Sequence, residues 1–293
     1  MFYLGIDAGA SATKWSLINE SDVVATGLQE ALDGHIYRNT SRDRMNKILG
    51  EIEESISGKS ISRIYLGITG VVRDGSIEKI LRDKFTAEAI VVSDIELAYR
   101  ANFTDGAGIL LYAGTGSVAF AIDEKGEVQK IGGWGYLLGD EGAGYWIGRE
   151  AIRYVLNALE SKMEFTKSTF VQLVLDKLQI CDWDGIKTFV YSSDRSKIAA
   201  LSKVVDTAAD AGDREAIEIL HKAAEHLARL VKRIDNNLSL NSLPVKFTGG
   251  VSSSKILYRE MEKFLGMRIT ISTVDISLRA AELAREDLHA SSN

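Results

Sequence analysis

The fold of this chain is indicated by two stretches with one shared pattern, LGIDAGASATKWSLI at residues 4–18 and ILLYAGTGSVAFAI at residues 109–122. Each begins with an apolar run, continues through small residues, and ends in a run that alternates apolar and polar side chains. This pattern predicts a strand, a tight turn and a returning strand. Backbone N–H groups in such turns can close around an anion, and hydroxyl groups add donors. Two such turns could bind one polyphosphate.

Two other phosphate-binding motifs fit the sequence less well. Residues 114–119, GTGSVA, match the dinucleotide-binding pattern G-x-G-x-x-A, which requires a following helix and an acidic residue about twenty positions later. Residues 118–122 instead have a strand pattern, and residues 123–126 predict a hairpin turn. No stretch has the Walker A pattern G-x-x-x-x-G-K-[ST]. The remaining alternative is a pair of ordinary hairpins without a ligand.

A third stretch, IGGWGYLLGDEGAGYWIG at residues 131–148, has seven glycines among eighteen residues. Glycine loses the most backbone entropy on folding, so this density favours a loop that approaches a ligand closely. Trp134 supplies a rigid wall there, and Asp140 and Glu141 lie in mid-loop.

Together these stretches resemble the N-acetylglucosamine kinases and BadF-type ATPases, and the short archaeal hexokinases of that family. The family belongs to the superfamily of acetate and sugar kinases, heat-shock chaperones and actin. The resemblance extends over nearly the whole chain. The matching motifs, in order, are Asp7-x-Gly9-x-Ser11-x-Thr13-Lys14, Gly67–Gly70, Ser93-Asp94, Gly114–Ser117, the Gly-Trp-Gly loop and Thr248–Val251.

The resemblance implies an α/β fold with two ribonuclease-H-like domains, an interdomain nucleotide cleft and an α-helical insertion in the second domain. The expected domains are residues 1–105, on the sugar and phosphate side, and residues 106–293, on the nucleotide side. Helices expected near 166–178 and 183–192 form the insertion. A closing helix near 276–287 is a candidate to pack back on the first domain.

The composition limits the class of protein and its partners. The chain has 293 residues, 45% hydrophobic and 26% charged, as in soluble globular proteins. A net charge of −6 argues against nucleic acid as a partner. Cys181 is the sole cysteine, so no disulfide within the chain is expected. Neither a signal-peptide pattern nor a membrane-length apolar run occurs, so we expect a cytoplasmic protein. The resemblance implies a homodimer.

The resemblance also implies ATP and Mg²⁺ as cofactors. Asp7 ends a predicted strand and is expected to orient Mg²⁺ through water, since Mg²⁺ keeps much of its hydration shell; capping of the turn is the alternative. Where the family usually has Gly and Thr, this chain has Ala10 and Ser11. Ser11 keeps the hydroxyl group, and Ala10 would be strained only if the backbone at position 10 needed a positive φ. The residues expected to contact the phosphates or the nucleoside are Gly9, Ser11, Thr13, Lys14, Gly114, Thr115, Gly116, Ser117, Gly249 and Gly250.

Asp94 is the candidate catalytic base. It follows the apolar strand at residues 89–92 and precedes a predicted helix, so capping of that helix is a second possible role. In phosphoryl transfer such an Asp accepts the proton of the acceptor hydroxyl. The other residues expected near the substrate, apart from a basic loop, are Gly70, Gly133, Trp134, Asp140 and Glu141. The two acidic residues fit a solvated turn equally well.

The loop that contains His35 and Arg38, called the basic loop here, is expected to influence which sugar is bound. Relatives usually have an Asn before the helix near 40–57, where this chain has His35 with Arg38 nearby, and Arg73 follows the turn at 67–70. Arginine favours carboxylates through charge-assisted hydrogen bonds. An acidic sugar such as 2-keto-3-deoxygluconate is therefore a candidate beside glucose and N-acetylglucosamine, and a solvated basic loop is the alternative.

A second class of function is an ATPase subunit that activates a dehydratase or reductase. Activators of the BadF type bridge a dimer through an iron–sulfur cluster, which needs cysteine thiolates. Cys181 stands alone and lies outside the glycine-rich loops, which disfavours this interpretation. The sequence therefore predicts an ATP-dependent carbohydrate kinase.

Overall fold

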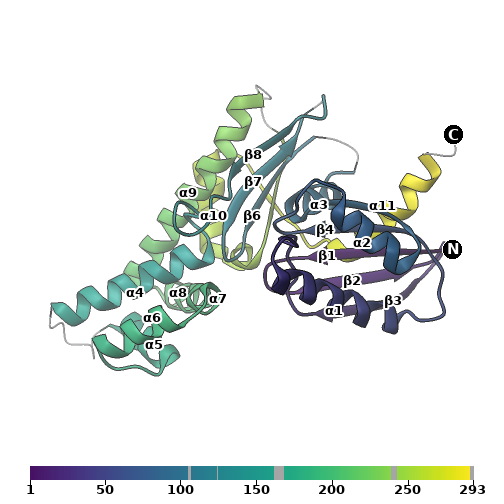
Figure 1. Cartoon of the computed structure of the whole chain (residues 1–293). Coiled ribbons are helices and arrows are strands. Elements are labelled where there is room, and N and C mark those ends of the chain that lie inside the picture. Colours follow the sequence, from purple (N-terminus) through teal and green to yellow (C-terminus); the bar gives the residue numbers. More distant parts are fainter. Residues whose placement is uncertain (105–106, 124, 162–167, 239–242, 291–293) are drawn as a thin grey trace. The chain divides into compact units, whose positions relative to one another are not determined.

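The computed structural model describes residues 1–104, 107–123, 125–161, 168–238 and 243–290 (Figure 1). The chain forms two compact units, residues 1–105 with 273–293, and residues 106–272. Each unit contains one five-stranded sheet with helices packed on it. The closing helix at the end of residues 106–293, a candidate from the sequence to pack back on the first domain, packs with the first unit.

The sheet of the first unit has the strand order β3-β2-β1-β4-β5. β1 (Phe2–Ala8), β2 (Thr13–Ile18) and β3 (Val23–Gln29) form an antiparallel meander. β4 (Ile61–Ile68) pairs parallel with β1, and β5 (Glu88–Ser93) pairs parallel with β4. The carboxyl ends of three strands therefore meet at one edge, where α/β proteins bind ligands.

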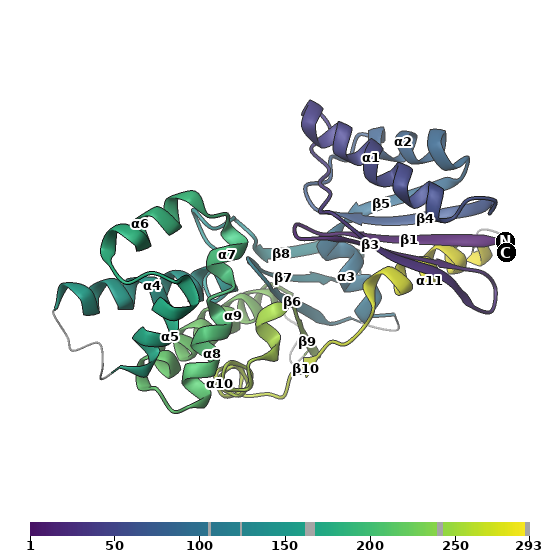
Figure 2. The ribbon, with the colours of Figure 1, turned by 90° about the horizontal axis from the view of Figure 1, so that it is seen from below.

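Helices cover both faces of this sheet (Figure 2). α1 (Asn39–Ser55) and α2 (Ser76–Phe85) pack on one face, and α3 (Asp94–Asn102) and α11 (Ile276–Ala290) pack on the other. Successive side chains of β1 point to opposite faces. Its even-numbered residues face α1 and α2, and its odd-numbered residues face α3 and α11. Asp7 therefore lies on the face of α3 and α11.

α11 approaches the sheet closely because β1 has a glycine beneath it. A Cβ atom on Gly5 would lie 2.2 Å from both the backbone nitrogen of Ala281 and the backbone oxygen of Ser277. The hydroxyl oxygens of Ser277 and Ser16, on β2, are 2.8 Å apart and hydrogen-bonded. These contacts hold α11 on the first unit although it follows the second unit in sequence.

The sheet of the second unit has the order β10-β9-β6-β7-β8. β6 (Ile109–Ala113), β7 (Ser117–Ile122) and β8 (Val128–Gly132) repeat the antiparallel meander. β9 (Val245–Thr248) pairs parallel with β6, and β10 (Thr270–Ile271) pairs parallel with β9. The two predicted glycine hairpins thus occupy equivalent places in two sheets of one plan.

One long amphipathic helix supports the second sheet. α9 (Arg214–Leu238) packs across β6, β7 and β8, with its apolar stripe, including Leu227 and Val231, buried. α10 (Lys255–Leu265) packs along α9, as Figure 1 shows. No helix in the described ranges combines the length and hydrophobicity needed to cross a membrane.

The predicted helical insertion is present in the second unit. It follows α4 (Gly144–Glu160) and begins with α5 (Thr169–Leu178) and α6 (Trp183–Ser192), both of which were predicted. Two further helices, α7 (Arg195–Ala199) and α8 (Ser202–Asp210), were missed. The five residues of α7 are too few to show a helical period, and α8 begins without a side-chain cap to mark its start.

Candidate active site

Two carboxylates lie at the carboxyl edge of the first sheet. Asp7 of β1 pairs with Gly67 of β4, and the next residue of β4, Ile68, pairs with Ser93, the last residue of β5. Asp94 follows Ser93 directly as the first residue of α3. Asp7 and α3 share one face of the sheet, and the two carboxylates are close enough to affect each other's charge.

The surroundings of Asp7 oppose its ionisation. Its pKa is raised from the ordinary 3.8 to about 6. Burial contributes most, because it removes water from the charged form, and the negative charges of Asp94 and Asp275 add to it. Lys14, which pairs with Asp7 across the hairpin, lowers the pKa of Asp7 and so acts in the opposite direction. A cation bound here would relieve the repulsion.

The structure separates the two roles considered for Asp94. Ser93 caps α3, because its hydroxyl oxygen accepts a hydrogen bond from the N–H of Glu96 at 3.3 Å. The carboxylate of Asp94 accepts a bond from the N–H of Ile95 at 2.9 Å and remains partly exposed. Asp94 is thus not the N-cap, and its role as catalytic base stays a prediction.

The turn between β1 and β2 contains backbone N–H groups that are not hydrogen-bonded within the described residues. The N–H of Gly9 donates to the carbonyl oxygen of Ala12 at 3.1 Å, but the N–H groups of Ala10 and Ser11 make no hydrogen bond within the described residues. Ala10 does not have positive φ, so alanine causes no strain there. Thr13 is fully buried, and its expected phosphate contact stays a prediction.

The turn between β6 and β7 is anchored at both ends. Gly114 donates its N–H to the carbonyl oxygen of Gly116 at 3.0 Å. The first N–H groups of α4, from Gly144 and Tyr145, donate to the carbonyl oxygens of Gly114 and Thr115 at 2.8 and 3.2 Å. The N–H groups of Thr115 and Gly116 have no acceptor within the described residues. Each glycine turn therefore offers N–H donors to an anion, as phosphate binding requires.

Asp140 packs against this second turn. Its carboxylate accepts a hydrogen bond from the N–H of Ser117 at 3.3 Å, and a Cβ atom on Gly116 would lie 2.6 Å from it. Asp140 is 7% exposed and has a φ of 62°, in the left-handed region that Asp tolerates better than most residues. Burial raises its pKa, although the bond from Ser117 and the charge of Arg195 lower it. Support of the turn is a role that the sequence did not predict, and sugar binding by Asp140 stays a prediction.

Other residues expected near the sugar line the glycine-rich loop. The N–H of Gly133 donates to the carbonyl oxygen of Ser117 at 2.9 Å, which starts the loop beside the turn. The side chain of Trp134 is largely exposed. Glu141 is partly exposed, and its backbone oxygen accepts a bond from the Ser117 hydroxyl at 3.1 Å. The backbones of Gly133 and Glu141 thus contact the second turn, and Trp134 follows Gly133 in the same loop.

The glycine pair after β9 lies against the same turn. Gly249 has a φ of 100°, and a Cβ atom there would lie 2.4 Å from the carbonyl oxygen of Ala113 at the end of β6. A Cβ atom on Gly250 would meet no atom within 4 Å. Gly249 is therefore required by packing, and Gly250 leaves open space at this edge of the second sheet.

In the first unit, two loops lie side by side at the sheet edge. Thr69 donates its N–H to the carbonyl oxygen of Ala8 at 3.0 Å, and Gly34 donates to the carbonyl oxygen of Thr69 at 2.8 Å. A Cβ atom on Gly70 would lie 2.4 Å from the ring of His35. The structure therefore brings together His35 and Gly70, which the sequence placed at the sugar.

The three basic residues considered for the sugar are held differently. Asp33 accepts a hydrogen bond from the backbone N–H of His35 and lies 3.0 Å from its ring Nδ1. The guanidinium of Arg38 lies over a neighbouring tyrosine ring, 5.4 Å from its centroid. Arg73 donates from Nη2 to a carboxylate oxygen of Glu96 at 2.8 Å. Asp33 and Glu96 were missed from the sequence, where each resembles an ordinary turn or cap residue.

The residues at Asp7 suit Mg²⁺. Within the described ranges, no group of three or more His, Cys, Asp or Glu side chains is arranged to hold a metal ion. Mg²⁺ does not need such a group, because proteins bind it through one or two carboxylates, water and substrate phosphates. The partly exposed carboxylate of Asp7, with Asp94 beside it, fits that mode.

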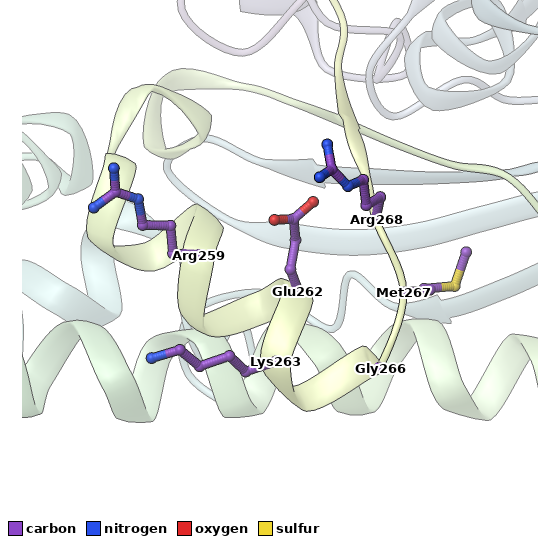
Figure 3. Close-up of a pocket in the computed structure, with 6 residues that line it drawn as sticks. All are labelled: Arg259, Glu262, Lys263, Gly266, Met267 and Arg268. Atoms are coloured by element: carbon purple, nitrogen blue, oxygen red, sulfur yellow. The ribbon is translucent and has the colours of Figure 1, made fainter.

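A pocket of about 540 Å³ lies elsewhere in the second unit, at the end of α10 (Figure 3). Its lining residues are Arg259, Glu262, Lys263, Gly266, Met267 and Arg268. Glu262 accepts hydrogen bonds from the Tyr258 hydroxyl and the Ile269 N–H, so it ties α10 to the chain that follows. The pocket lies along α10 from Arg259 onward and along the chain that follows this helix, and none of its lining residues belongs to the candidate site. The pocket is therefore not part of the candidate site.

Comparisons with known proteins agree with this geometry. The sequence matches the BadF/BadG/BcrA/BcrD ATPase family over residues 4–282. It is 31% identical to the N-acetylmuramic acid/N-acetylglucosamine kinase of Clostridium acetobutylicum over 282 aligned positions, covering 91% of this chain and 90% of that protein. It is 26% identical to the N-acetyl-D-glucosamine kinase of Dictyostelium discoideum over 314 aligned positions, covering 96% and 97%.

A similar fold occurs in a crystal structure of a proposed N-acetylglucosamine kinase from Chromobacterium violaceum. The TM-score is 0.79 at 23% identity, and the match covers 97% of this chain and 98% of that one. This likeness confirms the predicted α/β fold with two ribonuclease-H-like domains.

Proposed function

The chain belongs to the BadF/BadG/BcrA/BcrD ATPase family, and from this premise we propose that it is an ATP- and Mg²⁺-dependent carbohydrate kinase. It would transfer the γ-phosphate of ATP to a hydroxyl of an N-acetylated amino sugar. The observation that carries the proposal is the position of Asp94 beside Asp7, at the carboxyl edge of the first sheet. A proton acceptor and a cation-binding carboxylate are the two groups that phosphoryl transfer to an alcohol needs most.

Each group has a part in this chemistry. Asp94 would accept the proton of the sugar hydroxyl as its oxygen attacks the γ-phosphate. Asp7 would hold Mg²⁺ through water, and the bound metal would neutralise charge on the phosphate oxygens. The free N–H groups of the two glycine turns would bind phosphate oxygens within their own units. Lys14, exposed opposite Asp7, would add a positive charge.

The relatives support an amino sugar as the acceptor. Both curated relatives are named as kinases of N-acetylglucosamine, and one of them also as a kinase of N-acetylmuramic acid. N-acetylmuramic acid carries a carboxylate, as 2-keto-3-deoxygluconate does, so it also meets the expectation of an acidic sugar, and it is the one for which a relative is named. The homodimer and the cytoplasmic location stay predictions.

The alternative, an ATPase that activates a dehydratase or reductase, lacks support at its essential residue. Cys181 is exposed between α5 and α6, in the helical insertion. A cluster shared between two subunits would need more than one thiolate from each chain. The kinase is therefore the function that we propose.

The test is the substitution Asp94→Asn, assayed with N-acetylglucosamine and N-acetylmuramic acid. We expect kcat to fall by at least about a hundredfold, because Asn cannot accept a proton, whereas calorimetry should show unchanged binding of sugar and of a non-hydrolysable ATP analogue. Mass spectrometry of the wild-type product should show one added phosphoryl group on the sugar.

The matched control is Asp83→Asn, the same change at an exposed position of α2, which should keep wild-type turnover. A variant at position 94 that retains more than about a tenth of wild-type kcat would remove Asp94 as the base. ATP hydrolysis without any phosphorylated sugar, across a panel of amino sugars, hexoses and sugar acids, would contradict the kinase itself.

A further inference from the structure

One cluster of charges beside Asp94 has no part in the mechanism above. The loop that follows β4 brings Arg73 to the first turn of α3, where its Nη2 donates to Glu96 Oε2 at 2.8 Å. The other oxygen of Glu96, Oε1, accepts bonds from Nε and Nη2 of Arg100 at 3.1 and 2.9 Å. Two guanidinium groups thus share one carboxylate.

Both carboxylate oxygens of Glu96 accept hydrogen bonds from these two arginines. Residues 93–96 read Ser-Asp-Ile-Glu, the pattern of a capping box, in which the Glu side chain would return to the backbone N–H of the cap. Ser93 does accept the bond from the N–H of Glu96, but the carboxylate of Glu96 is bonded to the arginines instead. The side chain of Glu96 is only 7% exposed. A carboxylate so deeply buried needs such partners, and it fixes the position of Arg73.

Arg73 retains donors for a ligand and is also held in place. Its side chain is 69% exposed, and the described contacts use one of its five N–H donors. His35 is paired with Asp33. Arg38 keeps its donors as well, but its described side-chain contact is with the exposed ring of Tyr37, and no carboxylate among the described residues fixes its position.

The position of Arg73 relates it to the acceptor. Glu96, its anchor, follows Asp94 by two residues on α3, so the two side chains leave the helix on different sides, and the link to the acceptor is the loop that carries Arg73. The loop that carries Arg73 begins at Thr69 and Gly70, which contact Gly34 and His35 at the sheet edge. The neighbouring acidic residue, Asp74, accepts hydrogen bonds from the backbone and hydroxyl of Ser76, so it is occupied at the start of α2.

From this arrangement we infer that Arg73, positioned by Glu96, recognises the carboxylate of an acidic amino sugar and sets a preference for it over the neutral sugar. The inference deepens the proposed function and rests on it. N-acetylmuramic acid differs from N-acetylglucosamine by one lactyl ether that ends in a carboxylate, so the two sugars form a matched pair. A guanidinium can bind such a carboxylate with two parallel hydrogen bonds.

The experiment compares kcat/KM for the two sugars in the wild type and in Arg73→Gln. We expect kcat/KM for N-acetylmuramic acid to fall roughly ten- to a hundredfold, the effect of losing hydrogen bonds to a charged group. The value for N-acetylglucosamine should stay within about threefold, because that sugar has no carboxylate to lose. Arg73→Glu should lower the acidic sugar's value further, through repulsion.

Two further variants test whether the loss for the acidic sugar is specific to Arg73 and to its partner Glu96. Arg44→Gln removes an exposed arginine of α1 in the same unit, to which no part in binding is assigned, and should leave the ratio of the two sugars unchanged. Glu96→Gln should raise KM for N-acetylmuramic acid while leaving kcat and the KM for N-acetylglucosamine unchanged, because Glu96 acts through Arg73. If Glu96→Gln does not fold, the exposed Arg73 variants still decide the question.

The outcomes separate this inference from the proposed function. Equal losses for both sugars in Arg73→Gln, or a ratio that changes in Arg44→Gln instead, would overturn the role of Arg73 and leave the kinase intact. A wild type that phosphorylates only the neutral sugar would do the same. If neither sugar is phosphorylated, the proposed function fails, and calorimetry with N-acetylmuramic acid alone then decides: unchanged affinity in Arg73→Gln overturns the inference, and weakened affinity supports it.

Discussion

The carboxylate of Asp7 is placed where its charge destabilises the protein without a bound cation. Its pKa of about 6 lies above the ordinary 3.8, so the folded protein binds a proton at Asp7 more tightly than the unfolded chain does. The stability from this proton is fully present below about pH 4 and is lost as the pH rises through about 6. The whole shift corresponds to at most about 3 kcal/mol.

Asp7→Asn should therefore change the pH dependence of stability. Asn stays neutral at every pH, so the variant should gain on the wild type as the pH rises, by up to about 3 kcal/mol between about pH 4 and pH 7.5. Urea unfolding in Mg²⁺-free buffer at several pH values measures this difference in the free energy of unfolding. A difference that does not vary with pH would contradict the raised pKa.

Carbon NMR of the Asp7 carboxyl gives an independent readout. Its titration midpoint should lie near 6 in the wild type and should fall in Asp94→Asn, because that variant removes a neighbouring negative charge. The same variant that tests the catalytic base thus tests the electrostatic coupling of the pair.

At this scale, sequence patterns predicted positions better than roles. Asp94 was placed correctly after an apolar strand, but the cap is Ser93, one residue earlier. The pattern from Ser93 to Glu96 predicts a capping box, and only the fold brings Arg73 to Glu96 from a distant loop. The burial of Asp140 could likewise not be predicted from the sequence, because it depends on the absence of a side chain at Gly116, 24 positions earlier in the chain.

At the scale of elements, the second glycine hairpin and α4 stabilise each other. Ala143, at the N-cap of α4, provides no side-chain cap. The unpaired N–H groups of the first helical turn instead donate to the carbonyl oxygens of Gly114 and Thr115. The turn is thereby fixed with the N–H groups of Thr115 and Gly116 left for a ligand.

Gly116→Ala should damage this turn without unfolding the unit. The new Cβ would lie 2.6 Å from the Asp140 carboxylate, which would have to move and lose its bond to Ser117. We expect the affinity for an ATP analogue to fall about tenfold or more, the cost of losing one or two bonds to a charged group. Calorimetry measures the affinity, and circular dichroism checks the fold.

A double-mutant cycle with Asp140→Ala tests the cause. If Gly116→Ala acts by displacing the carboxylate, its effect on nucleotide affinity should largely disappear when that carboxylate is already absent. Additive effects in the double variant would mean that the methyl group obstructs the nucleotide directly. Unchanged affinity in Gly116→Ala would remove the second turn from the nucleotide site.

The elements themselves were largely predictable because their signals are local. Apolar alternation and glycine turns indicate the strands β1, β2, β6 and β7, and the period of 3.6 residues indicates α9. Helices α7 and α8 were missed: α7 has only five residues, and α8 begins at a residue that offers no side-chain cap, so its start has no signal in the sequence.

At the scale of the whole molecule, the last helix in the sequence belongs to the first unit and not to the second. The chain leaves the first unit near residue 105, completes the second, and returns with α11 to cover β1 of the first. The sequence predicted a domain boundary after residue 105, but no local pattern shows which sheet α11 covers. That depends on a contact between residues at opposite ends of the sequence, Gly5 and Ala281. The first unit is therefore complete only when the C-terminal helix is present.

Gly5→Ala tests this arrangement in the full-length protein. The added Cβ would meet backbone atoms of α11 at 2.2 Å, and backbone cannot move aside as a flexible side chain can. We expect a loss of about 1–3 kcal/mol or more, as for overpacking of a core. Hydrogen-exchange mass spectrometry should show faster exchange in 1–104 and 273–290, with 107–272 unchanged, because α11 packs on the first unit.

The matched control is Gly50→Ala in the middle of α1, in the same unit. A Cβ there would lie 3.8 Å from the Lys84 ammonium nitrogen, an ordinary contact, and alanine favours a helix over glycine by about 0.5–1 kcal/mol. This variant should therefore slow exchange, or leave it unchanged. If Gly5→Ala accelerates exchange equally in both units, or in neither, the docking of α11 on β1 does not complete the first unit.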